Sequence, residues 1–215
     1  MRNSIFILIL AALMALLIYA GGEQESDSPP VTDTEIDLDD PSLATAVFAG
    51  GCFWCTEADF EKLDGVVEAV SGYAGGDEEN PTYQQVAAGA TGHIESVMVY
   101  YDPEQVSYRE LVDYHWRYID PTDPDGQFVD RGPHYRTAIF YENQEQLNIA
   151  RESRQRLIDS GVFEEDIVTD FIPLTRFWVA EEYHQDYYLK NSMRYNFYRS
   201  GSGRDQFLEE VWGAE

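Results

Sequence analysis

The order of apolar and polar positions predicts a strand, a turn and a helix early in the chain. Residues 44–49 (ATAVFA) form the apolar run that is typical of a short buried strand. Gly50 and Gly51 follow as a turn, and residues 52–63 (CFWCTEADFEKL) space their apolar side chains as a helix does. The side chain at position 52 is therefore expected at the N-terminus of a helix.

Strand and helix patterns alternate through the rest of the chain. Alternating and β-branched side chains predict strands over residues 66–73, 94–101, 135–141, 168–174 and 177–180. Helical spacing predicts helices over residues 107–119, 143–160 and 205–212. Ser107 and Glu110 form a capping box at the first of these helices, and Gly161 ends the second. Strands interleaved with helices imply a two-layer α+β domain.

The N-terminal region has a different pattern. Arg2 precedes the uncharged run 5–20, which would make about 24 Å of helix, short for a membrane span and typical of a secretory signal. Because Ile18 is large for a cleavage site after Ala20, both a signal peptide and an uncleaved membrane anchor stay open for residues 1–20. We predict a flexible acidic linker over residues 21–41 and a catalytic domain over residues 42–215, outside the cytoplasm, either periplasmic, secreted or anchored.

The composition excludes some classes of binding partner. The chain has 40 acidic and 14 basic residues, a formal net charge of -26. Such a surface repels nucleic acid and anionic lipid, so we expect neither as a partner, and a membrane contact only through residues 1–20. Aromatic residues make up 14% of the chain, too many for a disordered protein, and they suggest a pocket lined by rings.

The two cysteines carry the candidate chemistry. Cys52 and Cys55 are the chain's only cysteines and are separated by Phe53 and Trp54. Thiols react as thiolates, and a helix N-terminus lowers a thiol pKa, so Cys52 is the candidate nucleophile. Three other interpretations are open: an inert buried thiol, a structural disulfide, and half of a zinc site. The last is disfavoured because four scattered histidines offer no matching half, and we predict no metal.

Several short motifs follow one another along the chain. They are Gly51-Cys52-Phe53-Trp54, residues 71–76 (SGYAGG), 80–83 (NPTY) and 91–95 (TGHIE), Asp130, residues 134–139 (HYRTAI) and residues 180–187 (AEEYHQDY). In this order they resemble the A-type peptide methionine sulfoxide reductases, which act on methionine-S-sulfoxide. The resemblance covers roughly residues 44–190 and implies an α+β fold, a two-layer α/β sandwich with a mixed, mainly antiparallel sheet and a ferredoxin-like core.

The resemblance implies a role for each matching residue. Cys52 would attack the sulfoxide sulfur and become a sulfenic acid, while Glu95 donates a proton to the oxygen. The other roles that it implies are these: Tyr83 and Tyr135 assist the acid, Phe53 and Trp54 pack on the substrate methyl, Asp130 binds the substrate backbone N–H, and His184 and Tyr187 lie at or near the pocket. We also predict that Glu95 is partly buried, with its pKa raised towards neutrality.

The chain departs from the commonest family pattern at the second thiol. Many members carry a resolving cysteine in a mobile C-terminal tail, whereas residues 191–215 contain none. Cys55 stands where a glycine is common. Either Cys55 resolves the Cys52 sulfenic acid, or an external thiol does so directly.

We therefore expect repair of oxidised proteins and peptides by a monomer without a bound cofactor, reduced by a thioredoxin-like protein or a dithiol. Three alternatives differ in their use of Cys52. A thioredoxin-like thiol-disulfide oxidoreductase would use Cys52 and Cys55 alone, and a cysteine hydrolase would pair Cys52 with His134 or His184. A non-catalytic aromatic binding module would keep its ligand affinity without the thiol.

Overall fold

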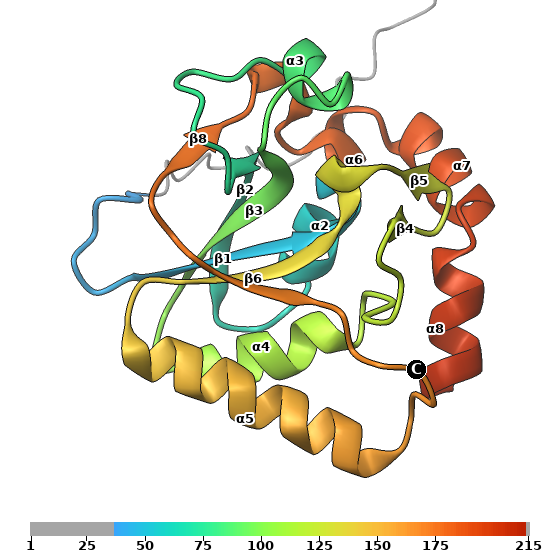
Figure 1. The fold of residues 1–215 in the computed structure, drawn as a ribbon. Helices are drawn as coiled ribbons and strands as arrows, with labels where there is room; N and C mark the ends of the chain where they lie inside the picture. The colour runs from blue at the N-terminus through green and yellow to red at the C-terminus, as the bar shows by residue number, and fades with distance from the viewer. Residues whose placement is uncertain (1–36, 214–215) are drawn as a thin grey trace, which may run out of the picture. The chain divides into compact units, whose positions relative to one another are not determined.

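The computed structural model describes residues 37–213, whose centre is a six-stranded mixed sheet (Figure 1). The strands are β1 (Ala44–Gly50), β2 (Val66–Ala74), β3 (Ile94–Tyr101), β6 (Thr137–Tyr141), β7 (Asp170–Pro173) and β8 (Phe177–Val179), in the order β7-β6-β1-β3-β2-β8. Only the β6–β7 pair is parallel. The fold class predicted from the sequence, a mixed and mainly antiparallel α+β sheet, is confirmed.

The sheet is curled. Strands β7 and β8 lie at opposite edges, yet only residues 174–176 separate them in the chain. Four Cα steps span at most about 14 Å, whereas five strand spacings across a flat sheet would take about 24 Å. The two edges must therefore approach each other. Leu174 and Phe177 pack on the core along this short path.

Helices cover the sheet and its ends (Figure 1). The longer helices are α2 (Phe53–Phe60), α4 (Tyr108–Trp116), α5 (Gln144–Ser160), α7 (Ser192–Gly201) and α8 (Arg204–Trp212). Short elements are α3 (Tyr83–Ala87), α6 (Tyr187–Lys190), the 3-10 turns η1 (Pro133–Tyr135) and η2 (Glu182–His184), and a two-stranded sheet of β4 (Gly126–Gln127) and β5 (Asp130–Arg131). Within the described range, no helix is long and apolar enough to cross a membrane.

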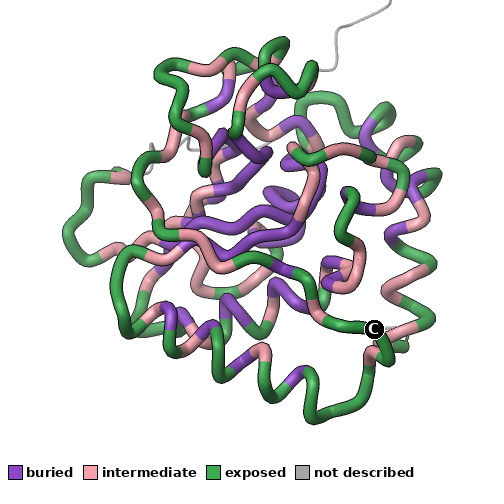
Figure 2. The backbone as a smooth tube through the Cα atoms, viewed as in Figure 1, coloured by how far each residue is buried: buried purple, intermediate pink, exposed green. Residues whose placement is uncertain are grey.

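The central strands are buried along most of their length (Figure 2). Phe48 on one face of β1 packs with Phe60 of α2, their ring centroids 4.8 Å apart, and with the buried apolar face of α4. Val47 and Ala49 point to the other face, where they join Ile94 and Phe140. Because β1 is central and buried on both faces, its C-terminal end is a firm support for the residues that follow it.

Most predicted elements are present, with shifted ends. The strand 94–101 has the predicted bounds, the capping box of Ser107 and Glu110 is formed, and Gly161 ends α5 in the left-handed conformation. The predicted strand 135–141 starts later, because residues 133–135 form η1. The sequence did not predict α3, α7 or the β4–β5 pair. Residues 1–36, with the signal or anchor and most of the linker, lie outside the described residues.

Candidate active site

The turn between β1 and α2 presents Cys52. Gly51 adopts φ +84, and a Cβ there would lie 2.5 Å from the Cβ of Gln127, so only glycine fits. Cys52 is the N-cap residue of α2, as the sequence predicted, and its carbonyl accepts the N–H groups of Cys55 and Thr56. The strand, turn and helix therefore hold Cys52 at a fixed position, where the residue is 6% exposed.

Glu95 is a buried acid beside the start of α2. Its side chain comes from β3, is 1% exposed, and accepts the Phe53 N–H at Oε2 over 3.1 Å. Burial raises the pKa of Glu95 to about 8. The hydrogen bond from Phe53 lowers this pKa, whereas the charges of Asp130 and Cys55 raise it further. The direction is the one predicted, and the carboxyl is protonated at neutral pH.

The aromatic residues of the motif form a wall around this end of α2. The Trp54 ring stacks on Tyr187, with centroids 3.7 Å apart, and Phe53 packs against His184 at 4.9 Å. Trp54 Nε1 donates to His184 Nδ1 over 3.1 Å, so Nδ1 is unprotonated. Burial lowers the pKa of His184, which is consistent with a neutral ring.

Tyr83 and Tyr135 lie on the Glu95 side of the site. The Tyr83 ring is 6.4 Å from Phe53, and burial raises its pKa to about 12, with Glu95 and Cys52 contributing. Burial also raises the Tyr135 pKa, and the charges of Glu95, Tyr83 and Cys52 act in the same direction. Both phenols therefore keep their protons and can donate hydrogen bonds.

Asp130 has a partner that the sequence did not reveal. Its Oδ2 accepts a hydrogen bond from the hydroxyl of Tyr198, on α7, and burial together with the charges of Cys52 and Cys55 raises the pKa of Tyr198. Burial raises the pKa of Asp130. The structure thus brings all predicted site residues to one end of α2, and it adds Tyr198.

The two thiols shift each other's pKa values, and the directions differ from the expectation. Burial raises the pKa of Cys52, and Cys55, Glu95 and Asp130 add to the increase. The interaction with Cys52 lowers the pKa of Cys55 to about 7, assisted by Arg204 and Arg199. The expected lowering of the Cys52 pKa is wrong because burial outweighs the helix effect, and the Phe53 N–H at the start of α2 donates to Glu95. Cys55 is therefore the more acidic thiol of the pair.

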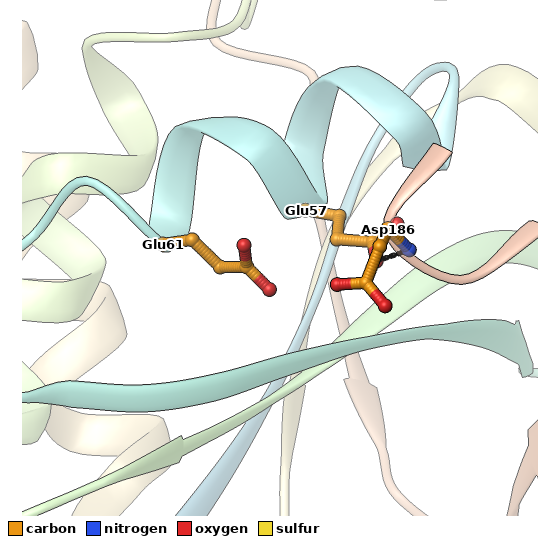
Figure 3. Close-up of side chains that lie close together, drawn as sticks. All are labelled: Glu57, Glu61 and Asp186. Carbon is orange, nitrogen blue, oxygen red and sulfur yellow. Dashed lines mark hydrogen bonds between the residues drawn. The ribbon is translucent and has the colours of Figure 1, made fainter. Parts of the chain in front are cut away.

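Three carboxylates behind the site are close enough to hold a metal ion (Figure 3). Oxygens of Glu57, Glu61 and Asp186 lie within 4.8 Å of one another. Several are already engaged: Glu57 accepts from Ser71 Oγ and from the Asp186 N–H, each over 2.6 Å, and Glu61 accepts from the Tyr188 hydroxyl. The cluster fastens the segment that carries His184 and Tyr187 to α2.

Sequence reasoning missed the contribution of residues 191–213. Tyr198 and Arg199 on α7, together with Arg204 on α8, reach the site from a region without a matching motif. It also missed Gln127, whose Cβ closes the space over Gly51. For Arg204 one signal existed, since Ser202 and Gly203 before it predict a turn and a new helix start.

Comparison with known proteins agrees with this geometry. The family model "Peptide methionine sulfoxide reductase" matches residues 44–215. The reductase MsrA of Halalkalibacterium halodurans is 54% identical over 171 residues, 80% of this chain and 97% of that protein. MsrA/MsrB of Vibrio cholerae is 51% identical over 206 residues, 96% of this chain but only 53% of the relative, so the chain spans about half the length of that protein.

Solved structures show the same fold. Reduced Mxr1 from Saccharomyces cerevisiae has a TM-score of 0.68 and 32% identity, covering 74% of this chain and 91% of that one. Methionine sulfoxide reductase A of Corynebacterium diphtheriae has a TM-score of 0.65 and 34% identity, covering 73% and 78%. The fold and site thus define an oxidoreductase that acts on methionine sulfoxide in protein repair. The chain belongs to the peptide methionine sulfoxide reductase family, in its A-type branch.

Proposed function

We propose that this enzyme reduces methionine-S-sulfoxide, free or in proteins, to methionine through a sulfenic acid on Cys52. One observation carries the proposal: the Cys52 sulfur lies at the start of α2 beside the buried, protonated Glu95. A sulfoxide needs a nucleophile at sulfur and an acid at oxygen, and these two residues supply both.

In the first step the Cys52 sulfur attacks the sulfoxide sulfur, and the S–O oxygen is protonated by Glu95. Cys55, the more acidic of the two thiols, would receive the proton of the Cys52 thiol during attack. The oxygen passes to Cys52, the substrate leaves as methionine, and Cys52 is oxidised to the sulfenic acid. The Cys52 thiol proton is then on Cys55 and the Glu95 proton is on the sulfenic hydroxyl, and Glu95 takes up a proton from solvent before the next turnover.

In the second step Cys55 attacks the sulfenic sulfur, a disulfide forms, and the hydroxyl leaves as water. An external dithiol, in the cell a thioredoxin-like protein, then reduces the Cys52–Cys55 disulfide and is itself oxidised. Residues at i and i+3 have Cα atoms roughly 5 Å apart, within the range that a disulfide bridges. No bound cofactor takes part in this scheme.

The aromatic residues around the start of α2 would bind the substrate side chain. Phe53 and Trp54 receive the apolar methyl group, and Asp130 accepts the backbone N–H of a methionine sulfoxide residue in a peptide. His184 and Tyr187 position Trp54 through the Nε1 hydrogen bond and the ring stack.

The nucleophile is tested with Cys52→Ser and a defined sulfoxide epimer. Wild-type enzyme should reduce the S epimer in the presence of a dithiol and leave the R epimer unchanged. Cys52→Ser should abolish the reaction while keeping the wild-type circular dichroism spectrum, because a hydroxyl is a far weaker nucleophile towards sulfur. More than a few per cent of activity in the folded variant would contradict the assignment.

The resolving step is tested by oxidising the enzyme with one equivalent of methionine sulfoxide and counting thiols. Resolution by Cys55 predicts no free thiol and a mass lower by about two hydrogens. The Cys55→Ser variant is the matched control and should stop at a trappable sulfenic acid. One remaining thiol together with a sulfenic acid in the wild-type protein would show instead that an external thiol acts directly.

We also propose export and action as a monomer. The apolar run at residues 5–20 after Arg2 supports export, and the acidic segment 21–41 would separate membrane or signal from domain. Fractionation of the native host with N-terminal sequencing tests the location, and light scattering tests the monomer. The full-length chain in the soluble cytoplasm would overturn export, and an intact Met1 in the membrane fraction would identify an anchor.

A further inference from the structure

Arg204 is a buried cation directly behind the nucleophile. It is the first residue of α8, is 1% exposed, and belongs to the C-terminal region that the family motifs do not reach. Its Nη1 donates to the Tyr118 carbonyl over 2.5 Å, and its Nη2 donates to the Gly50 carbonyl over 3.0 Å. The guanidinium carbon lies 4.5 Å from the centre of the Phe128 ring.

These contacts place the guanidinium against the turn that presents Cys52. A Cβ on Gly51 would lie 3.4 Å from Arg204 Nη2, so the cation touches the backbone one residue before the nucleophile. The Gly50 carbonyl that Arg204 binds is the last of β1. The side chain thereby joins the end of the central strand to the start of α8.

Arg204 forms no ion pair within residues 37–213, although its charge also acts on the half-buried Asp130, where it opposes the effect of burial on the pKa. The nearby Arg199 makes ion pairs with Asp59 over 2.8 Å and with Asp205 over 2.9 Å. Arg204 has neutral carbonyl partners only, and no carboxylate within residues 37–213 forms an ion pair with it. Burying a charge without an ion-pair partner costs free energy, so the rest of the fold must offset the desolvation of Arg204.

The groups whose charges face Cys55 come from several elements: Cys52, Arg204, Arg199, Asp59, Tyr195, Tyr198 and Glu95. Only Arg204 and Arg199 are cations, and Arg199 is paired. Arg204 is thus the unpaired cation facing the dithiol, and it lowers the Cys55 pKa more than Arg199 does.

We propose that Arg204 is a positioning residue of the dithiol site, which fixes the Gly50–Gly51 turn and provides the buried positive charge that stabilises the Cys55 thiolate. This role rests on the proposed function, in which Cys55 attacks the Cys52 sulfenic acid and leaves again when the disulfide is reduced. A stabilised thiolate is available for attack at neutral pH and is a good leaving group. Helix α8 is therefore part of the catalytic apparatus.

The test follows the titration of each thiol by NMR in full-length protein labelled at cysteine Cβ. The chain has 2 cysteines, and the single Cys→Ser variants assign the two signals. Arg204→Met should raise the Cys55 midpoint by about one pH unit or more, which is about a tenfold loss of thiolate below the midpoint. Disulfide formation in single turnover at pH 7 should slow by a similar factor.

Two further variants separate charge from position. Arg204→Lys keeps the charge and should hold the Cys55 midpoint near its wild-type value, while the altered hydrogen bonding to the turn lowers the rate of sulfenic acid formation. Arg109→Met is the matched control, because Arg109 is exposed and pairs with Glu152 on the surface. It removes the same net charge and should leave the titration unchanged.

Each outcome decides the proposal. An unchanged Cys55 midpoint in folded Arg204→Met overturns it, even if the disulfide still forms. If Arg204→Met does not fold, Arg204→Gln takes its place, because glutamine can still donate a hydrogen bond to the Gly50 carbonyl, and the Cys55 midpoint should rise in the same way. An unchanged midpoint in folded Arg204→Gln overturns the proposal. Failure of the wild-type protein to form a disulfide would instead refute the resolving role, independently of the titration.

Discussion

At the scale of single residues, the groups of the site differ in their protonation state in the substrate-free enzyme. Burial keeps a proton on Glu95, whose pKa is about 8, and on Cys52, whose pKa is raised. The interaction with Cys52, assisted by two arginines, lowers the pKa of Cys55 to about 7, which makes Cys55 the more acidic thiol. Acid, nucleophile and base are thus distinguished by their surroundings.

Glu95→Gln should slow sulfenic acid formation by about 10²–10⁴, the usual loss when a positioned acid is removed. Glutamine can still accept the Phe53 N–H, so the start of α2 should be kept. In wild-type enzyme the contribution of the acid falls as pH rises through about 8, where Glu95 loses its proton. The variant should lack this dependence. Rapid-quench single turnovers across pH 6–10 would measure both effects.

Glu57→Gln is the matched control for this experiment. Glu57 is also buried, and burial raises its pKa to about 8, but its carboxylate binds Ser71 and the Asp186 N–H on the other side of α2. The variant should retain the wild-type pH dependence of sulfenic acid formation. A wild-type rate in Glu95→Gln would show that the acid is another residue.

Gly51→Ala should destabilise the fold by several kcal/mol and reduce activity, because the left-handed backbone and the clash with Gln127 both oppose a Cβ. Gly161→Ala provides the comparison. Gly161 has φ +67, and no atom lies within 4 Å of the position that a Cβ would take, so it should lose only about 1–2 kcal/mol and keep its activity. Urea unfolding and steady-state kinetics test the pair. Equal losses of stability would exclude the packing explanation.

At the scale of elements, sequence reasoning succeeded where local signals were strong. The strand 94–101 alternates clearly, and Asn143 and Gly161 mark the ends of α5 as its cap residues. It could not place β7 and β8 at opposite edges, because strand order depends on the curl of the whole sheet. Pairings between distant strands leave no mark in local periodicity.

The C-terminal helices were the main omission. Helix α7 buries only Tyr195 and Arg199, so it lacks the apolar stripe that identifies a helix. The pairing of β4 with β5 was missed for a related reason, since each strand has only two residues. The motif residues of the site were found, whereas Tyr198 and Arg204 depend on tertiary contacts that no motif records.

The capping box of α4 gives a prediction for an element far from the thiols. Ser107→Ala removes the hydroxyl that accepts the Glu110 N–H, and it should cost about 1 kcal/mol, or about 2–4 °C in Tm. Ser200→Ala on the exposed face of α7 is the matched control. Ser200 bonds only carbonyls of its own helix, so its loss should be neutral. Thermal unfolding measures both, and equal Tm values would contradict the capping effect.

At the scale of the whole molecule, the net charge of -26 and the buried acids both make the folded state less stable as the pH rises. Burial raises the pKa of Glu57 and Glu95 to about 8, and of the half-buried Glu68 to about 7. The folded state keeps protons on these carboxyls that the unfolded chain releases near its ordinary pKa of 4.5. Stability should therefore fall as pH rises from about 5 to about 8.

Unfolding experiments at two pH values would test this linkage through Glu57. Each pKa unit corresponds to about 1.4 kcal/mol, so wild-type protein should lose a few kcal/mol between pH 5.5 and pH 8.5. Glu57→Gln cannot ionise and should lose less, becoming more stable than wild type at pH 8.5 but not at pH 5.5. In 1 M salt, where the Debye length is about 3 Å, surface repulsion is screened while this difference should remain, because the carboxyl is buried. A stability difference between the two proteins that does not change with pH would show that Glu57 is ionised in the folded state throughout.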